Sequence, residues 1–136
     1  MRFFMRKKIA GVVCLCMVLV FTCVAGAVTP RWSNIRSCII SHVYVDGSIC
    51  CDVEITGVPD ATLISNVDIV LKKYIGNDQW QEICRWENMY CVGNEFQFYD
   101  EVPNMLTGCT YRLCVTAYVY RDGVPEYLEQ YHEGSH

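Results

Sequence analysis

The sequence is poor in charged residues and, after residue 27, in helical patterning. Charged residues make up 19 % of the 136 positions and hydrophobic residues 52 %, which excludes an intrinsically disordered chain. Four prolines and nine glycines form no low-complexity tract. No stretch of ten residues after position 27 repeats its apolar positions with a helical period. The sequence therefore predicts one compact domain made of strands.

Acidic residues are missing from the first 27 positions. Four basic residues lie within the first eight positions, and an uncharged apolar run follows over residues 9–28. Ala25 and Ala27 supply the small residues that a signal peptidase accepts. We therefore expect a signal peptide over residues 1–27, a single domain over residues 28–136, and a secreted or cell-envelope protein. An uncleaved membrane anchor is the alternative, because the apolar run is just long enough to span a bilayer. On either view the membrane is contacted only through the leader.

Basic residues are scarce in the expected mature chain. It holds seven of them against fifteen acidic residues, a net charge of −8. The sequence therefore predicts no phosphate-binding surface, and we expect no nucleic-acid partner.

Cysteine is abundant in the expected mature chain, which has seven: Cys38, Cys50, Cys51, Cys84, Cys91, Cys109 and Cys114. In an exported domain they predict disulfide bonds. The preferred bridge joins Cys84 to Cys91 across a turn predicted between Trp86 and Tyr90. A second bridge would join Cys50 or Cys51 to Cys109 or Cys114. The odd number leaves one thiol unpaired or available for a disulfide-linked dimer, and the alternative is that all stay reduced as small core residues.

Cys109 and Cys114 also have a spacing found in zinc sites. An offset of five residues on a regular strand sends the two side chains to opposite faces, so they cannot hold one ion. Cys84 and Cys91 could meet at a metal, but a disulfide explains them equally well. We expect no metal and no cofactor.

Short runs rich in Val, Ile, Tyr and Phe alternate with turn residues along the whole domain. They predict seven strands, at 35–45, 48–56, 66–74, 79–86, 95–100, 110–120 and 124–131. Seven short strands at this spacing are typical of an antiparallel β-sandwich. Period-two alternation places Cys51 in the core and gives residues 111–119 an unbroken apolar face. Trp80 and Trp86 are expected on one face of the fourth strand, where they would supply aromatic core.

Residues 106–117, with the sequence LTGCTYRLCVTA, resemble the corner and sixth strand of fibronectin type III domains. The resemblance implies an immunoglobulin/fibronectin type III-like sandwich in which the hydroxyl of Tyr111 bonds back to the corner backbone. The second strand departs from the fibronectin pattern, because Cys50 and Cys51 stand where a tryptophan is usual. Leu113 stands where an immunoglobulin domain has cysteine. The whole chain is also similar to small secreted proteins of Gram-positive bacteria, a resemblance that implies no activity.

No constellation of catalytic residues stands out. His42 lies in the first predicted strand, and His132 and His136 lie in a polar tail expected to be frayed. The sequence predicts a non-catalytic domain that binds a protein or carbohydrate at the cell surface. One alternative is a protease inhibitor or toxin-like effector that presents a loop at Gly57–Asp60. The other is a minimal cysteine hydrolase built on His42.

The strongest local signal is Asp122-Gly123, which favours a two-residue hairpin turn. That turn sets Tyr118 opposite Tyr127 and the buried Ala117 opposite Leu128. Tyrosines then share one open face beside Arg112 and Glu129, and they are Tyr118, Tyr120, Tyr127 and Tyr131. This face is the predicted ligand site, and the alternative is that the rings are ordinary cross-strand pairs that stabilise the sheet.

Overall fold

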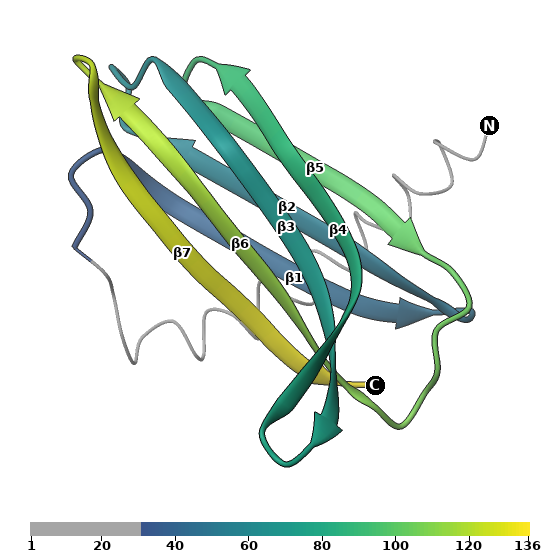
Figure 1. The fold of residues 1–136 in the computed structure, drawn as a ribbon. Helices are drawn as coiled ribbons and strands as arrows, with labels where there is room; N and C mark the ends of the chain where they lie inside the picture. Colours follow the sequence, from purple (N-terminus) through teal and green to yellow (C-terminus); the bar gives the residue numbers. More distant parts are fainter. Residues whose placement is uncertain (1–30) are drawn as a thin grey trace.

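A computed structural model describes residues 31–136, which form seven strands (Figure 1). The strands are β1 (Ile35–Val45), β2 (Ser48–Gly57), β3 (Leu63–Gly76), β4 (Gln79–Val92), β5 (Glu95–Val102), β6 (Thr110–Arg121) and β7 (Val124–Ser135). They build two antiparallel sheets, β1-β2-β5 and β4-β3-β6-β7, which pack face to face. The predicted seven-stranded sandwich is confirmed. The signal peptide expected over residues 1–27 lies outside the described residues.

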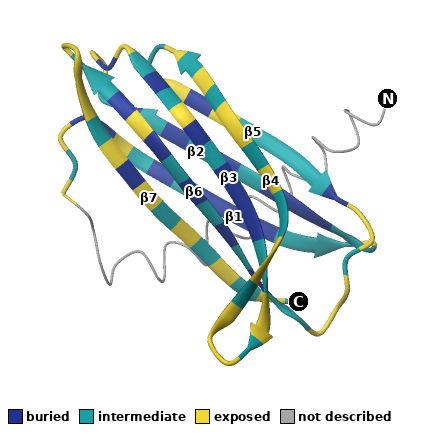
Figure 2. Cartoon of the chain, in the orientation of Figure 1, coloured by how far each residue is buried: buried dark blue, intermediate teal, exposed yellow. Residues whose placement is uncertain are grey.

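The core lies between the sheets and is built by the alternation that the sequence shows. Ile49, Cys51, Val53 and Ile55 of β2 are completely buried. The apolar face of β6 is buried from Tyr111 to Val119, and Figure 2 shows buried and less buried positions alternating along that strand. Residues of the two inner faces therefore interdigitate, as sandwich packing requires. The described part of the chain holds no helix with the length and apolar character needed to cross a membrane.

The strand β4 departs most from the sequence prediction, because it runs on to Val92 where a turn was expected after Trp86. In place of that turn there is a bulge, where Asn88 takes a left-handed φ of 56°. The amide N–H of Asn88 donates to the Asp68 carboxylate of β3 at 2.9 Å. A cross-strand carboxylate thus satisfies the backbone at the bulge, and the strand continues past it.

A second bulge in β4 separates the two tryptophans. Leu71 of β3 pairs with Cys84, but the next residue, Lys72, pairs with Glu82, so Ile83 is an extra residue in β4. One extra residue reverses which face each later side chain occupies. Trp86 therefore packs against the core, 5.0 Å from the Phe98 ring, whereas Trp80 lies on the outer face. The expectation that both tryptophans share the core face is wrong for Trp80.

No disulfide joins the cysteines of residues 31–136. Cys84 and Cys91 lie seven residues apart on the single strand β4, which at about 3.3 Å per residue separates them by roughly 20 Å. A disulfide needs Cα atoms within about 7 Å, so the predicted Cys84–Cys91 bridge is wrong. The second predicted bridge is also missing. Cys114 faces away from the core on the outer side of β6, and Cys51 is completely buried on β2 in the other sheet.

We expect intact-mass analysis of the folded protein to show no mass change on reduction. Cys38 and Cys51 should resist alkylation until the protein is denatured, because both are buried and burial raises the pKa of the Cys38 thiol to about 12. The half-exposed Cys91 and Cys109 serve as the internal control and should react in the native state. A gain of two mass units on reduction would contradict the structure.

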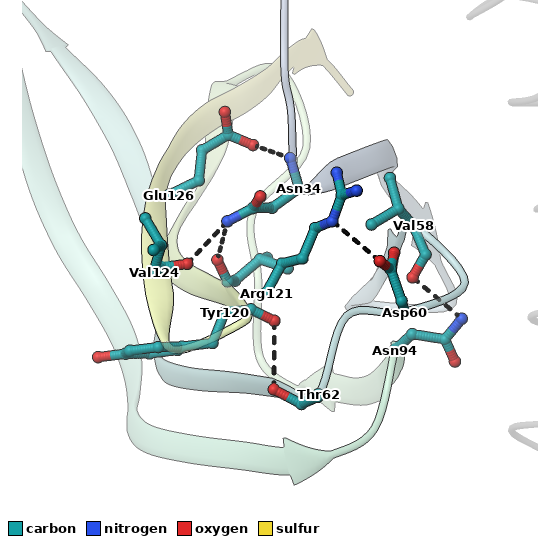
Figure 3. Close-up of polar contacts among 10 residues, drawn as sticks. Asn34, Val58, Asp60, Thr62, Asn94, Tyr120, Arg121, Val124 and Glu126 are labelled. Atoms are coloured by element: carbon teal, nitrogen blue, oxygen red, sulfur yellow. Dashed lines mark hydrogen bonds and ion pairs between the residues drawn. The ribbon is translucent and has the colours of Figure 1, made fainter.

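The start of β1 is fixed to the β6–β7 hairpin by a group of contacts that we name the entry clamp, formed by Asn34 and Glu126 (Figure 3). The Glu126 carboxylate accepts from the backbone N–H groups of Ser33, Asn34 and Ile35, at 2.8, 2.7 and 3.2 Å. The buried side-chain amide of Asn34 donates to the carbonyl oxygens of Val119 and Val124, each at 2.9 Å. These contacts join residues about 90 positions apart, so no local sequence pattern predicts them.

The loop at Gly57–Asp60, considered as an inhibitor loop, is held against the domain on several sides. The N–H of Val58 donates to the Asn34 carbonyl at 2.9 Å, and Arg121 forms an ion pair with Asp60 at 3.0 Å (Figure 3). Gly57 packs so closely that a Cβ there would lie 2.7 Å from the Cβ of Ala61. The loop is therefore fixed in place by its neighbours.

Candidate functional site

The β6–β7 hairpin has the register that its turn predicts. Asp122 and Gly123 take φ values of 52° and 73°, which a primed two-residue turn requires. Tyr118 pairs with Tyr127, and their ring centroids lie 5.2 Å apart. Since Ala117 and its partner Leu128 are completely buried, the tyrosine pair lies on the outer side of the sheet. Tyr118 is 38 % exposed and Tyr127 is 49 % exposed.

A shallow depression of about 480 Å³ lies beside this pair on the outer face of the four-stranded sheet. Cross-strand pairing builds it in rows. One row runs from Arg85 through Val70 and Cys114 to Tyr131, and the next includes Thr116 and Glu129. The charged lining carries both signs: Asp68, Lys72, Arg85, Arg112 and Glu129. We call this depression together with Tyr118 and Tyr127 the outer face site.

Arg112 forms one wall of the outer face site. Its guanidinium carbon lies 4.1 Å from the centre of the Trp80 ring and 4.2 Å from that of Tyr131. An ion pair at 2.8 Å joins Arg112 to Glu133 on the neighbouring strand. Because the group is stacked on both sides and paired, it holds the two aromatic rings in place. Its first role is thus to shape the site.

The predicted tyrosines do not form one continuous patch. Tyr118 and Tyr127 contact each other, while Tyr131 lies with Arg112 in the depression. Tyr120 is half-buried near the hairpin end, and its ring points away from the entry clamp in Figure 3. The structure therefore brings Tyr118, Tyr127, Tyr131 and Arg112 to the site and leaves Tyr120 at its margin.

Sequence reasoning missed the contributions of β3 and β4 to this site. Alternation along the third strand does set Asp68 and Lys72 opposite the core face, so their outward direction could have been read. No local sequence pattern shows that β3 lies beside β6. The bulge at Ile83 changes the face that Trp80 occupies, so regular alternation does not predict its position. These residues could be found only from the strand order.

The lining of the depression includes one thiol, that of Cys114. Partial burial raises the pKa of the Cys114 thiol, which leaves it protonated and a poor nucleophile at neutral pH. Among residues 31–136, no three or more His, Cys, Asp or Glu side chains are arranged to hold a metal ion. The site offers aromatic faces and hydrogen-bonding groups of both charges.

Comparisons with known proteins give this chain no family. No family model matches it, and no curated protein matches it. A search of solved structures finds the crystal structure of Spo0M, a sporulation control protein from Bacillus subtilis, at 13 % identity and a TM-score of 0.42. The match covers 74 % of this chain and 49 % of that one, so the chain spans about half the length of Spo0M.

The corner of the sandwich has the contact that the fibronectin resemblance implies. The buried Tyr111 donates its hydroxyl hydrogen to the Leu106 carbonyl at 2.9 Å. The bond spans the connection between β5 and β6 and fixes where β6 begins. It positions the strand that carries Arg112 and Tyr118.

His42 is the residue on which the cysteine-hydrolase alternative rests. His42 is completely buried, opposite Cys51 on β2, and burial raises the pKa of that thiol well above its ordinary value. His132 and His136 were expected in a frayed tail, but β7 continues to Ser135 and carries both rings to His42. The tail prediction is wrong because β6 pairs with β7 as far as Ser135.

Proposed function

We propose that this chain is a secreted or cell-envelope domain that binds carbohydrate without catalysis, and that the outer face site is where it binds. The observation that carries the proposal is the set of exposed tyrosine rings beside a depression lined by polar groups. A sugar ring has an apolar face of C–H groups and a rim of hydroxyls. Tyrosine rings stack on the face, and carboxylates and guanidinium groups bond the rim.

The charges of the site favour a ligand without strong net charge. Lys72 shares the depression with Asp68 and Glu129, and Arg85, which also lines it, is paired with Glu82 at 2.7 Å. Arg112 is already paired with Glu133. A strongly anionic or cationic ligand would meet a like charge within the same depression, whereas neutral hydroxyls can use donors and acceptors of either kind.

The proposal includes a fibronectin type III-like assignment of the fold. In constant-type immunoglobulin domains the fourth strand belongs to the sheet of the first, second and fifth strands. Here β4 pairs with β3, in the sheet of β6 and β7. This arrangement and the Tyr111 corner bond support the fibronectin-like alternative.

The double substitution Tyr118→Ser/Tyr127→Ser should weaken glycan binding about tenfold, since a pair of lost ring contacts costs about 1.4 kcal/mol. Binding is measured on a panel of cell-envelope polysaccharides by affinity electrophoresis. Tyr90→Ser is the matched control, because Tyr90 is 69 % exposed on β4 and belongs neither to the depression nor to the Tyr118–Tyr127 ring pair.

If Tyr90→Ser weakened glycan binding equally, or if the double variant bound as tightly as the wild type, the outer face site would not be the binding site. If the wild type bound no polysaccharide but bound a protein through the same tyrosines, the proposed carbohydrate ligand would be wrong. The outer face site would still be the binding surface.

A further inference from the structure

All three histidines of the chain meet at one place, where the edge strands β1 and β7 of the two sheets come together. Nδ1 of His42 lies 2.9 Å from Nδ1 of His132, a hydrogen bond that needs one nitrogen to carry a proton and the other to lack it. The His42 and His136 rings stack edge to face with centroids 5.0 Å apart. We name His42, His132 and His136 the histidine cluster.

The surroundings of the cluster disfavour positive charge. His42 is completely buried, and Nε2 of His42 and Nε2 of His136 are buried without a well-formed hydrogen bond. Burial and the other two histidines lower the pKa of His42 to about 3, and the backbone of Gly134 and Tyr111 offsets this only in part. Burial also lowers the pKa of His132 and of His136.

Two neutral side chains, those of Tyr111 and Cys51, face the cluster. Tyr111 of β6 contributes a neutral ring 6.3 Å from that of His136, and β2 places Cys51 opposite His42. The nearest acid along β7, Glu133, is bonded to Arg112 on the outer side. The row of His42 and Cys51 continues to Asp100 of β5, whose carboxylate accepts from the Trp86 indole N–H at 3.0 Å.

The cluster sits on the segment that completes the outer face site. Along the end of β7, His132 and Gly134 face inward while Tyr131 and Glu133 face outward. The segment is closed by backbone bonds, since the N–H of His136 donates to the Cys109 carbonyl at 3.0 Å and the N–H of Gly108 donates to the His136 carbonyl. If this end of β7 moves, the outer face site loses Tyr131 and the partner of Arg112.

We propose that the histidine cluster is an acid-sensitive latch that holds the end of β7 closed at neutral pH and releases it when the rings take up protons. A ring that is neutral in the closed state and has an ordinary pKa near 6.5 in the open state binds its proton only on opening. The closed state is therefore fully favoured above pH 6.5 and is lost progressively as the pH falls below it. For His42 alone, opening should become about 16-fold more frequent between pH 6.5 and pH 5.

The test is hydrogen–deuterium exchange of the full chain from pH 7.5 to pH 4.5, corrected for the intrinsic pH dependence of exchange. Amides of residues 131–135 should open at least tenfold more often at pH 5 than at pH 7, while residues 125–128 at the other end of β7 should change little. The latch does not depend on the proposed ligand. The exchange experiment therefore tests the latch independently of whether the protein binds glycan. Equal opening along all of β7, or no change, would overturn the latch.

Two further measurements test the latch, and the second needs no variant and so does not depend on a variant folding. His132→Gln and His136→Gln should each lower the pH dependence of opening at residues 131–135, because one proton uptake is removed. In the wild type, the imidazole Cε1–H resonance of His42 should show no titration in the closed state above pH 4.5. Titration near pH 6.5 in the closed state would refute the proposal without any substitution.

Discussion

Glu126→Ala is expected to lower the free energy of unfolding by about 3 kcal/mol at pH 7.5. The carboxylate accepts from three successive backbone N–H groups at the start of β1, and alanine leaves those donors without their charged partner. The loss also loosens Asn34, whose buried amide bonds the β6–β7 hairpin. Urea unfolding followed by tryptophan fluorescence measures the change.

Two companion variants separate the entry clamp from ordinary surface charge. Glu126→Gln keeps an acceptor oxygen without the negative charge and should lose about half as much stability. Glu87→Ala removes an exposed acid whose contact with Arg85 is long, at 3.6 Å, and should change stability by less than about 0.5 kcal/mol. A Glu126→Ala protein as stable as the Glu87→Ala protein would show that the clamp contributes nothing.

Gly57→Ala should destabilise the protein by about 2–3 kcal/mol because there is no room for one methyl group. A Cβ at this position would lie 2.7 Å from the Cβ of Ala61 and 3.3 Å from both the Asn34 carbonyl oxygen and a methyl of Val119. Neither a Cβ nor a backbone oxygen can rotate out of the way. The thermal midpoint Tm and the urea midpoint should both fall.

The clash can be checked by a compensating substitution. Adding Ala61→Gly to Gly57→Ala removes the closest contact and should recover part of the lost stability, although Ala61→Gly alone should destabilise. Gly134→Ala is the matched control, since a Cβ there would meet its nearest atoms at an ordinary 3.6 Å. Additive losses in the double variant would show that the contact with Ala61 is not the cause.

The sequence alone determined the strands and their buried faces, because both depend on local geometry. Successive side chains on a strand point to opposite faces, so the apolar positions from Tyr111 to Val119 identify the core side of β6. A two-residue turn permits one register, so Asp122 and Gly123 determined that Tyr118 faces Tyr127.

Only the tertiary structure decided what the strands place together. The bulge at Ile83 moved Trp80 to the outer face, and the bulge at Asn88 kept Cys84 and Cys91 far apart on one strand. A bulge depends on the partner strand as well as on the residues that form it, as the Asp68 carboxylate at Asn88 shows.

The histidine cluster and the entry clamp are the clearest examples of contacts that the sequence alone does not predict. Each joins β1 to β7 across about 90 residues of chain. Their partners meet because the edge strands of two separate sheets pack together, which follows from the order of strands and the closing of the core. Alternation within a strand determines which side a residue faces, and only the packing of the sheets determines what it meets there.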